Sequence, residues 1–194
     1  MTWPAPVTLT GALGGVRPLT PKDAPALAQA SADGDLGALW YTTVPRPEDV
    51  PAEIERRLAL QADGQMTAFA VITPQGTPVG MTTFMHPDQE NRRVEIGSTW
   101  YRKSVQRTGL NTQIKLLMLT HAFEDLDCIS VEFRTHVLNT QSRRAIERLG
   151  AKLDGILRAQ MILSNGSIRD TASYSIIAAE WPTVKAHLQA LAYH

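Results

Sequence analysis

The chain has 194 residues, of which 43% are apolar and 20% are charged, as in an ordinary soluble globular protein. Lys plus Arg and Asp plus Glu each number 19, so the formal net charge is zero, which disfavours an extended nucleic-acid-binding surface. The single cysteine excludes an intramolecular disulfide, and no apolar run reaches the roughly 18 residues of a membrane span. The amino-terminal segment MTWPAPVTLTG lacks the basic start and apolar core of a signal peptide. We therefore expect one cytoplasmic domain over 1–194, with no nucleic-acid or membrane partner.

The first quarter of the chain predicts an edge strand or hairpin followed by two helices. Residues 7–19 alternate weakly and are interrupted by glycines, as in a short hairpin. The segment 20–32 opens with a threonine N-cap and a proline at the first helical position, and 48–62 has helical apolar spacing. Between the helices, 33–47 reads as a loop.

The middle of the chain changes to a strand period. Three segments read as strands joined by short turns, which predicts an antiparallel meander: 66–73, 78–86 and 92–101. An apolar helix over 109–125 and an alternating strand over 128–136 follow. Because a strand, a helix and a strand in succession form a right-handed crossover, the strands 92–101 and 128–136 should be parallel neighbours.

The last third predicts a helix over 139–150, with Asn139 as its N-cap, and a hairpin made of 155–163 and 170–177. A terminal helix over 180–194 completes the chain. No repeat or linker interrupts the pattern. The fold class is therefore a mixed α/β (α+β) single domain.

The junction QRTGLNT at 106–112 has the features of an anion site. Gly109 stands where a helix begins, so unpaired amides and the helix dipole attract negative charge there. Arg107 adds a guanidinium, and Thr108 and Thr112 add hydroxyls. A plain strand-to-helix turn with a solvated arginine is the alternative on local physics.

Four blocks of the chain, in order, resemble the GCN5-related N-acetyltransferase superfamily over about residues 8–180. QRTGLN at 106–111 is similar to its acetyl-CoA loop, Gln/Arg-x-x-Gly-x-Gly/Ala, although Asn111 replaces the final small residue. The segment 138–158 is similar to the family's Asn-x-x-Ser/Ala helix, which ends in a Leu-Gly turn. Two further segments, 94–101 and 166–176, resemble the branch that acetylates ribosomal-protein N-termini.

The resemblance implies a twisted, mostly antiparallel mixed sheet with a V-shaped splay between the strands at 92–101 and 128–136. It implies a core over about 8–180 followed by the terminal helix. It also implies acetyl-CoA as cosubstrate, held by these residues: Ser98, Thr99, Trp100, Gln106, Arg107, Thr108, Gly109, Leu110, Asn111, Thr112, Asn139 and Ser142. The strand residues would pair with the pantetheine arm through their backbone, and 106–112 would take the pyrophosphate.

Two side chains are candidates for the chemistry. Many family members use a tyrosine acid at the position occupied here by Ile146, so Ser142, on the inward face of the same helix, is the substitute. It could equally bond only to the helix backbone. Glu95 is the candidate base, directly or through water, because Val94 and Ile96 point to the opposite face of the strand. A solvated strand carboxylate is the alternative.

The acceptor pocket is expected from the loop 33–47 and the hairpin 155–177. Its candidate residues are Trp40, Tyr41, His86, Arg158, Asp170 and Tyr174. The loop aromatics could instead pack under the loop, and Asp170 could pair with an arginine rather than with a substrate ammonium group. The sequence has no Cys/His cluster, so we expect no metal.

The leading hypothesis is an acetyl-CoA-dependent N-acetyltransferase that acts on a primary amine, either a protein or peptide N-terminus or a small amine or amino acid. A non-catalytic CoA-binding module and a nucleotide-binding protein using the same anion site remain alternatives. Because relatives of this kind are often dimers, the resemblance also suggests a homodimer.

Overall fold

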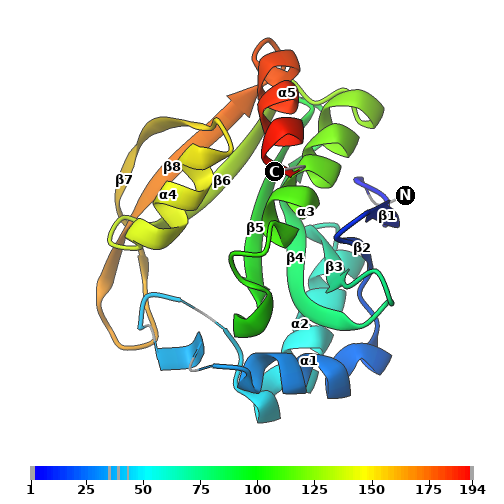
Figure 1. The fold of residues 1–194 in the computed structure, drawn as a ribbon. Coiled ribbons are helices and arrows are strands. Elements are labelled where there is room, and N and C mark those ends of the chain that lie inside the picture. Colours follow the sequence, from blue (N-terminus) through cyan, green and yellow to red (C-terminus); the bar gives the residue numbers. More distant parts are fainter. Residues whose placement is uncertain (1–2, 35, 39, 43, 193–194) are drawn as a thin grey trace.

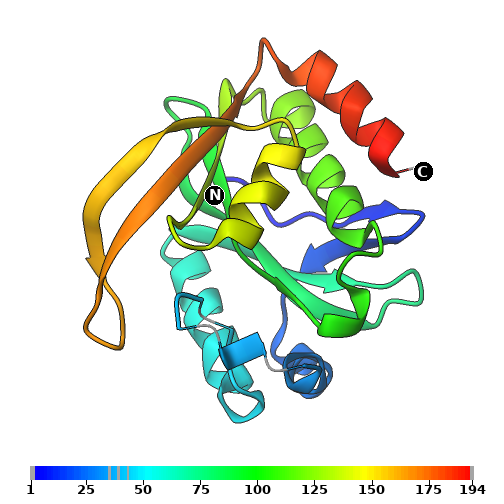
Figure 2. The ribbon, with the colours of Figure 1, turned by 60° about the vertical axis from the view of Figure 1, so that its left-hand side comes forward.

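The computed structural model describes residues 3–34, 36–38, 40–42 and 44–192. Within these ranges the chain forms one eight-stranded sheet in the order β1-β2-β3-β4-β5-β6-β8-β7, with helices on both faces (Figures 1 and 2). Every neighbouring pair is antiparallel except β5 and β6. The predicted fold class, with its mixed and mostly antiparallel sheet, is confirmed.

The described strands have these bounds: β1 Leu9–Gly11, β2 Gly14–Pro18, β3 Met66–Ile72, β4 Pro78–Asp88, β5 Arg93–Tyr101, β6 Ser130–His136, β7 Lys152–Ile162 and β8 Ile168–Ile177. All of them overlap segments predicted as strands, but β4 continues beyond the predicted end at 86, and β7 and β8 begin before the predicted starts at 155 and 170. The first two form the predicted hairpin, β3 to β5 form the predicted meander, and β7 and β8 form the second hairpin.

The described helices also match the predicted segments: α1 Ala24–Ala32, α2 Val50–Ala62, α3 Leu110–Thr120, α4 Thr140–Arg148 and α5 Trp181–Ala192. Short 3-10 turns precede three of these helices and lie in the loop after α1: η1 Pro21–Asp23, η2 Leu36–Ala38, η3 Pro47–Asp49 and η4 Lys103–Val105. No helix in the described ranges combines the length and apolar character needed to cross a bilayer.

The end of α3 differs from the prediction. The α-helix stops at Thr120 and continues as a π-helical turn, η5, over His121–Asp125. The reason is local hydrogen bonding, because the Leu126 amide donates to the carbonyl of His121, five residues back, at 3.0 Å.

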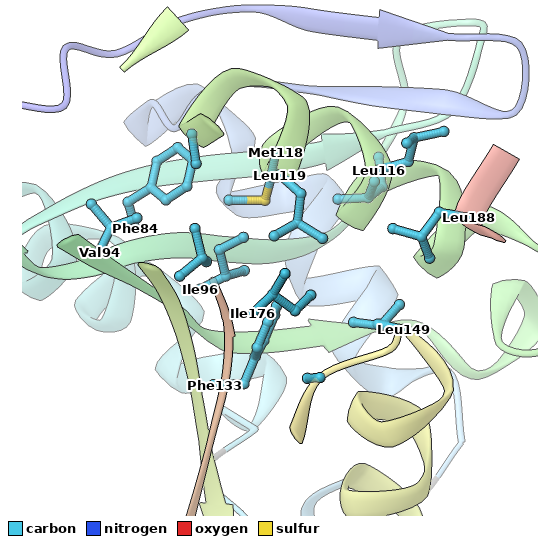
Figure 3. Close-up of a cluster of buried hydrophobic side chains, with 14 of the residues drawn as sticks. Phe84, Val94, Ile96, Leu116, Met118, Leu119, Phe133, Leu149, Ile176 and Leu188 are labelled. Atoms are coloured by element: carbon cyan, nitrogen blue, oxygen red, sulfur yellow. The ribbon is translucent and has the colours of Figure 1, made fainter. Parts of the chain in front are cut away.

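Two apolar clusters hold the helices against the sheet. On one face, α3 buries Ile114, Met118 and Leu119 completely, and they pack on Phe84 and other strand residues (Figure 3). The second cluster joins α1 and α2 to the opposite face. Because α3 is apolar on most of its surface, it packs deep against the sheet and fixes the position of its own N-terminus.

The parallel pair β5 and β6 is joined through α3, as predicted, and it separates part-way along. Pairing is confined to three positions, Arg93 with Ser130, Val94 with Val131, and Glu95 with Glu132. Beyond them the two strands diverge (Figure 1). The predicted V-shaped splay is therefore present, and the second half of β5 lies along it.

Candidate active site

A β-bulge shapes the half of β5 that does not pair with β6, which is called the unpaired half below although it still pairs with β4. Met81 pairs with Trp100 and Thr83 pairs with Gly97, so Thr82 alone stands opposite two residues, Ser98 and Thr99. Ser98 has a φ of 46°, in the left-handed region. The bulge re-aims the backbone at the point where β5 has left β6. All three predicted backbone contacts, at 98–100, therefore lie in the splay.

Both faces of the bulge are held by buried cations. Arg57 of α2, which is 2% exposed, donates from Nη2 to the Ser98 carbonyl at 3.1 Å. On the α3 face, the Lys115 ammonium donates to Thr99 Oγ1 at 3.0 Å. Neither cation was predicted as a site residue. For Lys115 the sequence signal was a charged residue at a helical position between apolar neighbours, Ile114 and Leu116.

The loop between β5 and α3 is held in place by its own backbone conformation and by hydrogen bonds within the chain. Arg107 and Gly109 have φ values of 64° and 83°, and Gly109 is the N-cap of α3. The Gln106 side-chain amide donates to the Tyr101 carbonyl at 3.0 Å, and Thr108 Oγ1 donates to the Val105 carbonyl at 2.7 Å. Among the described residues, nothing accepts from the backbone amides of 107–109. The arrangement can therefore receive an anion.

The three predicted site residues in the first turn of α3 differ in exposure and in contacts. Leu110 is buried, so it can contribute to an anion site only through its backbone, and Asn111 is half-buried. Thr112 is buried and accepts from Arg148 Nη2 at 3.2 Å. Arg148 thus brings a second guanidinium from the end of α4 to the start of α3. Sequence reasoning missed it because the two residues are 36 positions apart.

The start of α4 carries the predicted Asn–Ser pair. Asn139 is the N-cap, as predicted, and its Oδ1 accepts from the Ser142 amide at 3.0 Å. This bond leaves the NH₂ group of Asn139 without a partner among the described residues, and the same holds for the Ser142 hydroxyl. Ser142 is half-buried on the face shared with Ile146 and Leu149.

Glu95 lies at the point of the V in a network of charges. Its side chain is 6% exposed, and its Oε2 lies 2.9 Å from His86 Nδ1 and 3.6 Å from Arg134 Nε. Arg134 also pairs with Glu132. The hydrogen bond that the Glu95 carboxylate accepts from His86 raises the pKa of His86, whose own side chain is 61% exposed. Glu95 therefore orients a solvent-facing imidazole rather than facing solvent itself.

The loop 33–47 and the β7–β8 hairpin line one pocket of about 450 Å³. It contains Trp40, His136, Arg158 and Asp170. The Trp40 ring meets His136 edge-on at 5.3 Å and Tyr41 at 5.4 Å, so the two loop aromatics pack against their neighbours, and Trp40 also lines the pocket.

Inside this pocket, Asp170 is already paired. It accepts from the Ala159 amide at 2.8 Å and from Arg158 Nε at 2.6 Å, and these two bonds lower its pKa. Of the two options left open by the sequence, pairing with an arginine is the one present. His136 is buried, with Nδ1 accepting from the Leu138 amide.

Tyr174, which the sequence analysis placed in the acceptor set, lies in the core. It is fully buried, and its hydroxyl accepts from Arg143 Nε at 2.8 Å and donates to Glu147 at 2.7 Å. Ala172 and Ile176 lie on the same buried face of β8. Tyr174 is therefore a core residue under α4 and does not line the pocket.

A second pocket of about 450 Å³ lies on the α2 side of the bulge. Its walls include Glu53 of the helix, Asp49 of the preceding turn η3, Val44 of the loop before it, and Ser98 itself. Sequence reasoning missed this pocket, because only the fold brings α2 beside the bulge.

A family model described as an acetyltransferase (GNAT) domain matches residues 15–152. The protein named "Putative ribosomal N-acetyltransferase YdaF" of Bacillus subtilis (strain 168) is 31% identical over 173 residues, which cover 86% of this chain and 92% of that protein.

Two solved structures are also similar to this chain. A GCN5-related N-acetyltransferase from Brucella melitensis is 30% identical, with a TM-score of 0.83, and the match covers 96% of this chain and 86% of that chain. Mycobacterium smegmatis RimJ in complex with CoA-disulfide shares the fold at 22% identity, with a TM-score of 0.79 over 97% and 95% of the two chains.

Proposed function

The chain belongs to the GNAT family of acetyltransferases, and from this premise we propose that it transfers the acetyl group of acetyl-CoA directly to a primary amine. The amine is a protein or peptide N-terminus or a small amine or amino acid. One observation carries the proposal: the unpaired half of β5 runs from the Glu95–His86 pair to the anion loop at 106–112, with the Asn139-capped start of α4 across the splay.

The residues present fit acetyl-CoA. The free amides of 107–109, the exposed Arg107 and the positive end of α3 suit a pyrophosphate. Arg148 adds charge beside Thr112. On the β6 side the backbone of β5 at 98–100 has no strand partner, although the Ser98 carbonyl already accepts from Arg57, so this edge suits an extended arm. The free NH₂ group of Asn139 can donate to that arm from the other side.

When bound, acetyl-CoA supplies the acetyl group as a thioester. Ser142 then holds a hydroxyl proton on the inward face of α4, where it can donate a hydrogen bond to the departing sulfur. Its hydroxyl has no partner among the described residues, which supports this role. A serine is a weak acid, so we assign it hydrogen bonding rather than full proton transfer.

On the acceptor side, His86 is the group placed to take the proton of the amine. Glu95 is too buried to face solvent, and it holds His86 Nδ1, so Nε2 is free for the amine. We therefore refine the predicted role of Glu95 from base to orienting carboxylate. Trp40, Tyr41 and Arg158 would then border the acceptor.

The name of the Bacillus subtilis relative favours a ribosomal-protein N-terminus over a small amine. The test is a screen that offers acetyl-CoA with N-terminal peptides beside small amines and amino acids, with release of the free thiol as readout. Thiol release with at least one amine is expected. Binding of acetyl-CoA without release for any amine would argue against catalysis by this site.

Replacing Arg107 by alanine is expected to weaken acetyl-CoA binding about tenfold, because one charge-assisted contact to phosphate is lost. A truncated acetyl thioester that lacks the phosphates should lose almost nothing. Calorimetric titration of both ligands measures the difference. Equal losses for the two ligands would remove Arg107 from the pyrophosphate site.

Replacing Ser142 by alanine is expected to leave acetyl-CoA affinity unchanged and to lower kcat about tenfold, since one hydrogen bond to a developing charge is worth roughly that factor. The Asn139 cap accepts from the backbone amide of residue 142, so the Ser142→Ala variant retains the cap. Steady-state kinetics with the best amine from the screen gives the result. An unchanged kcat would leave Ser142 as a helix residue only.

A further inference from the structure

Lys115 is a buried lysine for which the fold offers almost no partner. It lies in the second turn of α3 and is 6% exposed. An ammonium group has three hydrogen-bond donors. Among the described residues only Thr99 Oγ1 accepts from it, at 3.0 Å, and no carboxylate pairs with it.

The burial of this amine works against stability. A buried cation without an anion is costly, and an apolar side chain of the same length normally packs there with a gain. Burial lowers the pKa of Lys115 to about 7, and no charged side chain contributes to that shift. The fold alone therefore gives no reason for a lysine at this position.

The location of Lys115 gives a reason for a lysine at this position. Thr99 is the second residue of the bulge, in the half of β5 that has left β6. Its hydroxyl also lies 2.7 Å from Thr82 Oγ1, so that oxygen is already shared. The Lys115 ammonium thus stands beside the splay, one helical turn beyond the anion loop, with two donors unused.

We propose that Lys115 is a ligand-binding residue of the acetyl-CoA site, whose free ammonium donors bind a carbonyl oxygen of the ligand arm lying along the unpaired half of β5. The inference rests on the proposed function. It differs from a purely structural role, in which Lys115 would only brace Thr99.

The experiment compares Lys115→Met, Lys115→Gln, Thr99→Val and the wild type. Lys22→Met, at an exposed lysine of η1, is the matched control. Calorimetry measures binding of acetyl-CoA and of 3′-phospho-ADP, which lacks the arm, and thermal unfolding measures stability without ligand.

Lys115→Met is expected to bind acetyl-CoA at least tenfold more weakly, to keep its affinity for 3′-phospho-ADP, and to unfold at the same or a higher temperature. Lys115→Gln should lose at least threefold. Thr99→Val should lose clearly less acetyl-CoA affinity than Lys115→Met, because it removes the hydroxyl that braces the ammonium and leaves the ammonium itself. Lys22→Met should match the wild type throughout.

Wild-type affinity for acetyl-CoA in the folded Lys115 variants overturns the inference. A loss in Thr99→Val as large as that in Lys115→Met also overturns it, because Lys115 would then act through Thr99. If the wild type itself binds no acetyl-CoA, the proposed function fails as well, so the two failures are distinguishable.

Discussion

Replacing Glu95 by glutamine is expected to lower kcat/KM on the order of 100-fold, the usual contribution of a positioned acid–base group. Glu95 accepts from His86 Nδ1 at 2.9 Å, and this bond raises the pKa of His86. Glutamine has no charge to hold the imidazole in one tautomer or to favour its protonation.

The pH–rate profile should shift in a direction that depends on the pKa of His86. With His86 as base, the wild-type rate falls as the pH drops through a pKa raised above the ordinary 6.5 of histidine. In Glu95→Gln the hydrogen bond that raises this pKa is lost, so the acid limb should move to lower pH. Arg134 also faces the pair, and its positive charge lowers the pKa of His86 because it disfavours the imidazolium.

The measurement is kcat/KM against pH for the wild type, Glu95→Gln and His86→Gln, together with an NMR titration of the His86 ring. His86→Gln should remove the limb altogether. Glu90→Gln, at an exposed glutamate in the β4–β5 turn, is the control and should change neither quantity. If the limb lies in the range of an ordinary carboxyl group and survives in His86→Gln, the base is Glu95 itself.

Replacing Leu119 by alanine is expected to lower the free energy of unfolding by about 2–5 kcal/mol. Leu119 is fully buried where α3 meets the sheet (Figure 3), so the substitution removes apolar contacts and leaves a cavity. Because α3 carries the anion loop at its start, acetyl-CoA affinity in the folded variant should change far less than stability.

Denaturant unfolding measures the difference, and Leu153→Ala is the matched control. Leu153 lies on β7 and is 48% exposed, so its truncation should cost less than about 1 kcal/mol. Equal losses in the two variants would mean that α3 does not anchor the core.

Local pattern was enough to predict the elements and the start of one helix. Alternation identified β6, helical apolar spacing identified α3, and Asn139 identified the start of α4. These features depend on the period of the backbone and on hydrogen bonds within a few residues, both of which can be read along the chain.

Side-chain partners were harder to predict. Tyr174, predicted in the acceptor set, is buried in the core, and the burial of Ala172 and Ile176 on the same face of β8 follows a two-residue period that the sequence contains. The pairing of Asp170 with Arg158 was one of two open options. Such choices depend on which face of a hairpin meets a helix, and a strand pattern leaves that open.

The sequence by itself determined the order of elements, the parallel crossover around α3 and the position of the glycine loop before α3, because each follows from the succession of segments along the chain. Only the tertiary structure decided what surrounds the splay. It placed Arg57 and Lys115 on opposite faces of one bulge, brought Arg148 to the start of α3, and joined Glu95 to His86. These contacts join different helices and strands, so they exist only when the sheet, with helices on both faces, has assembled.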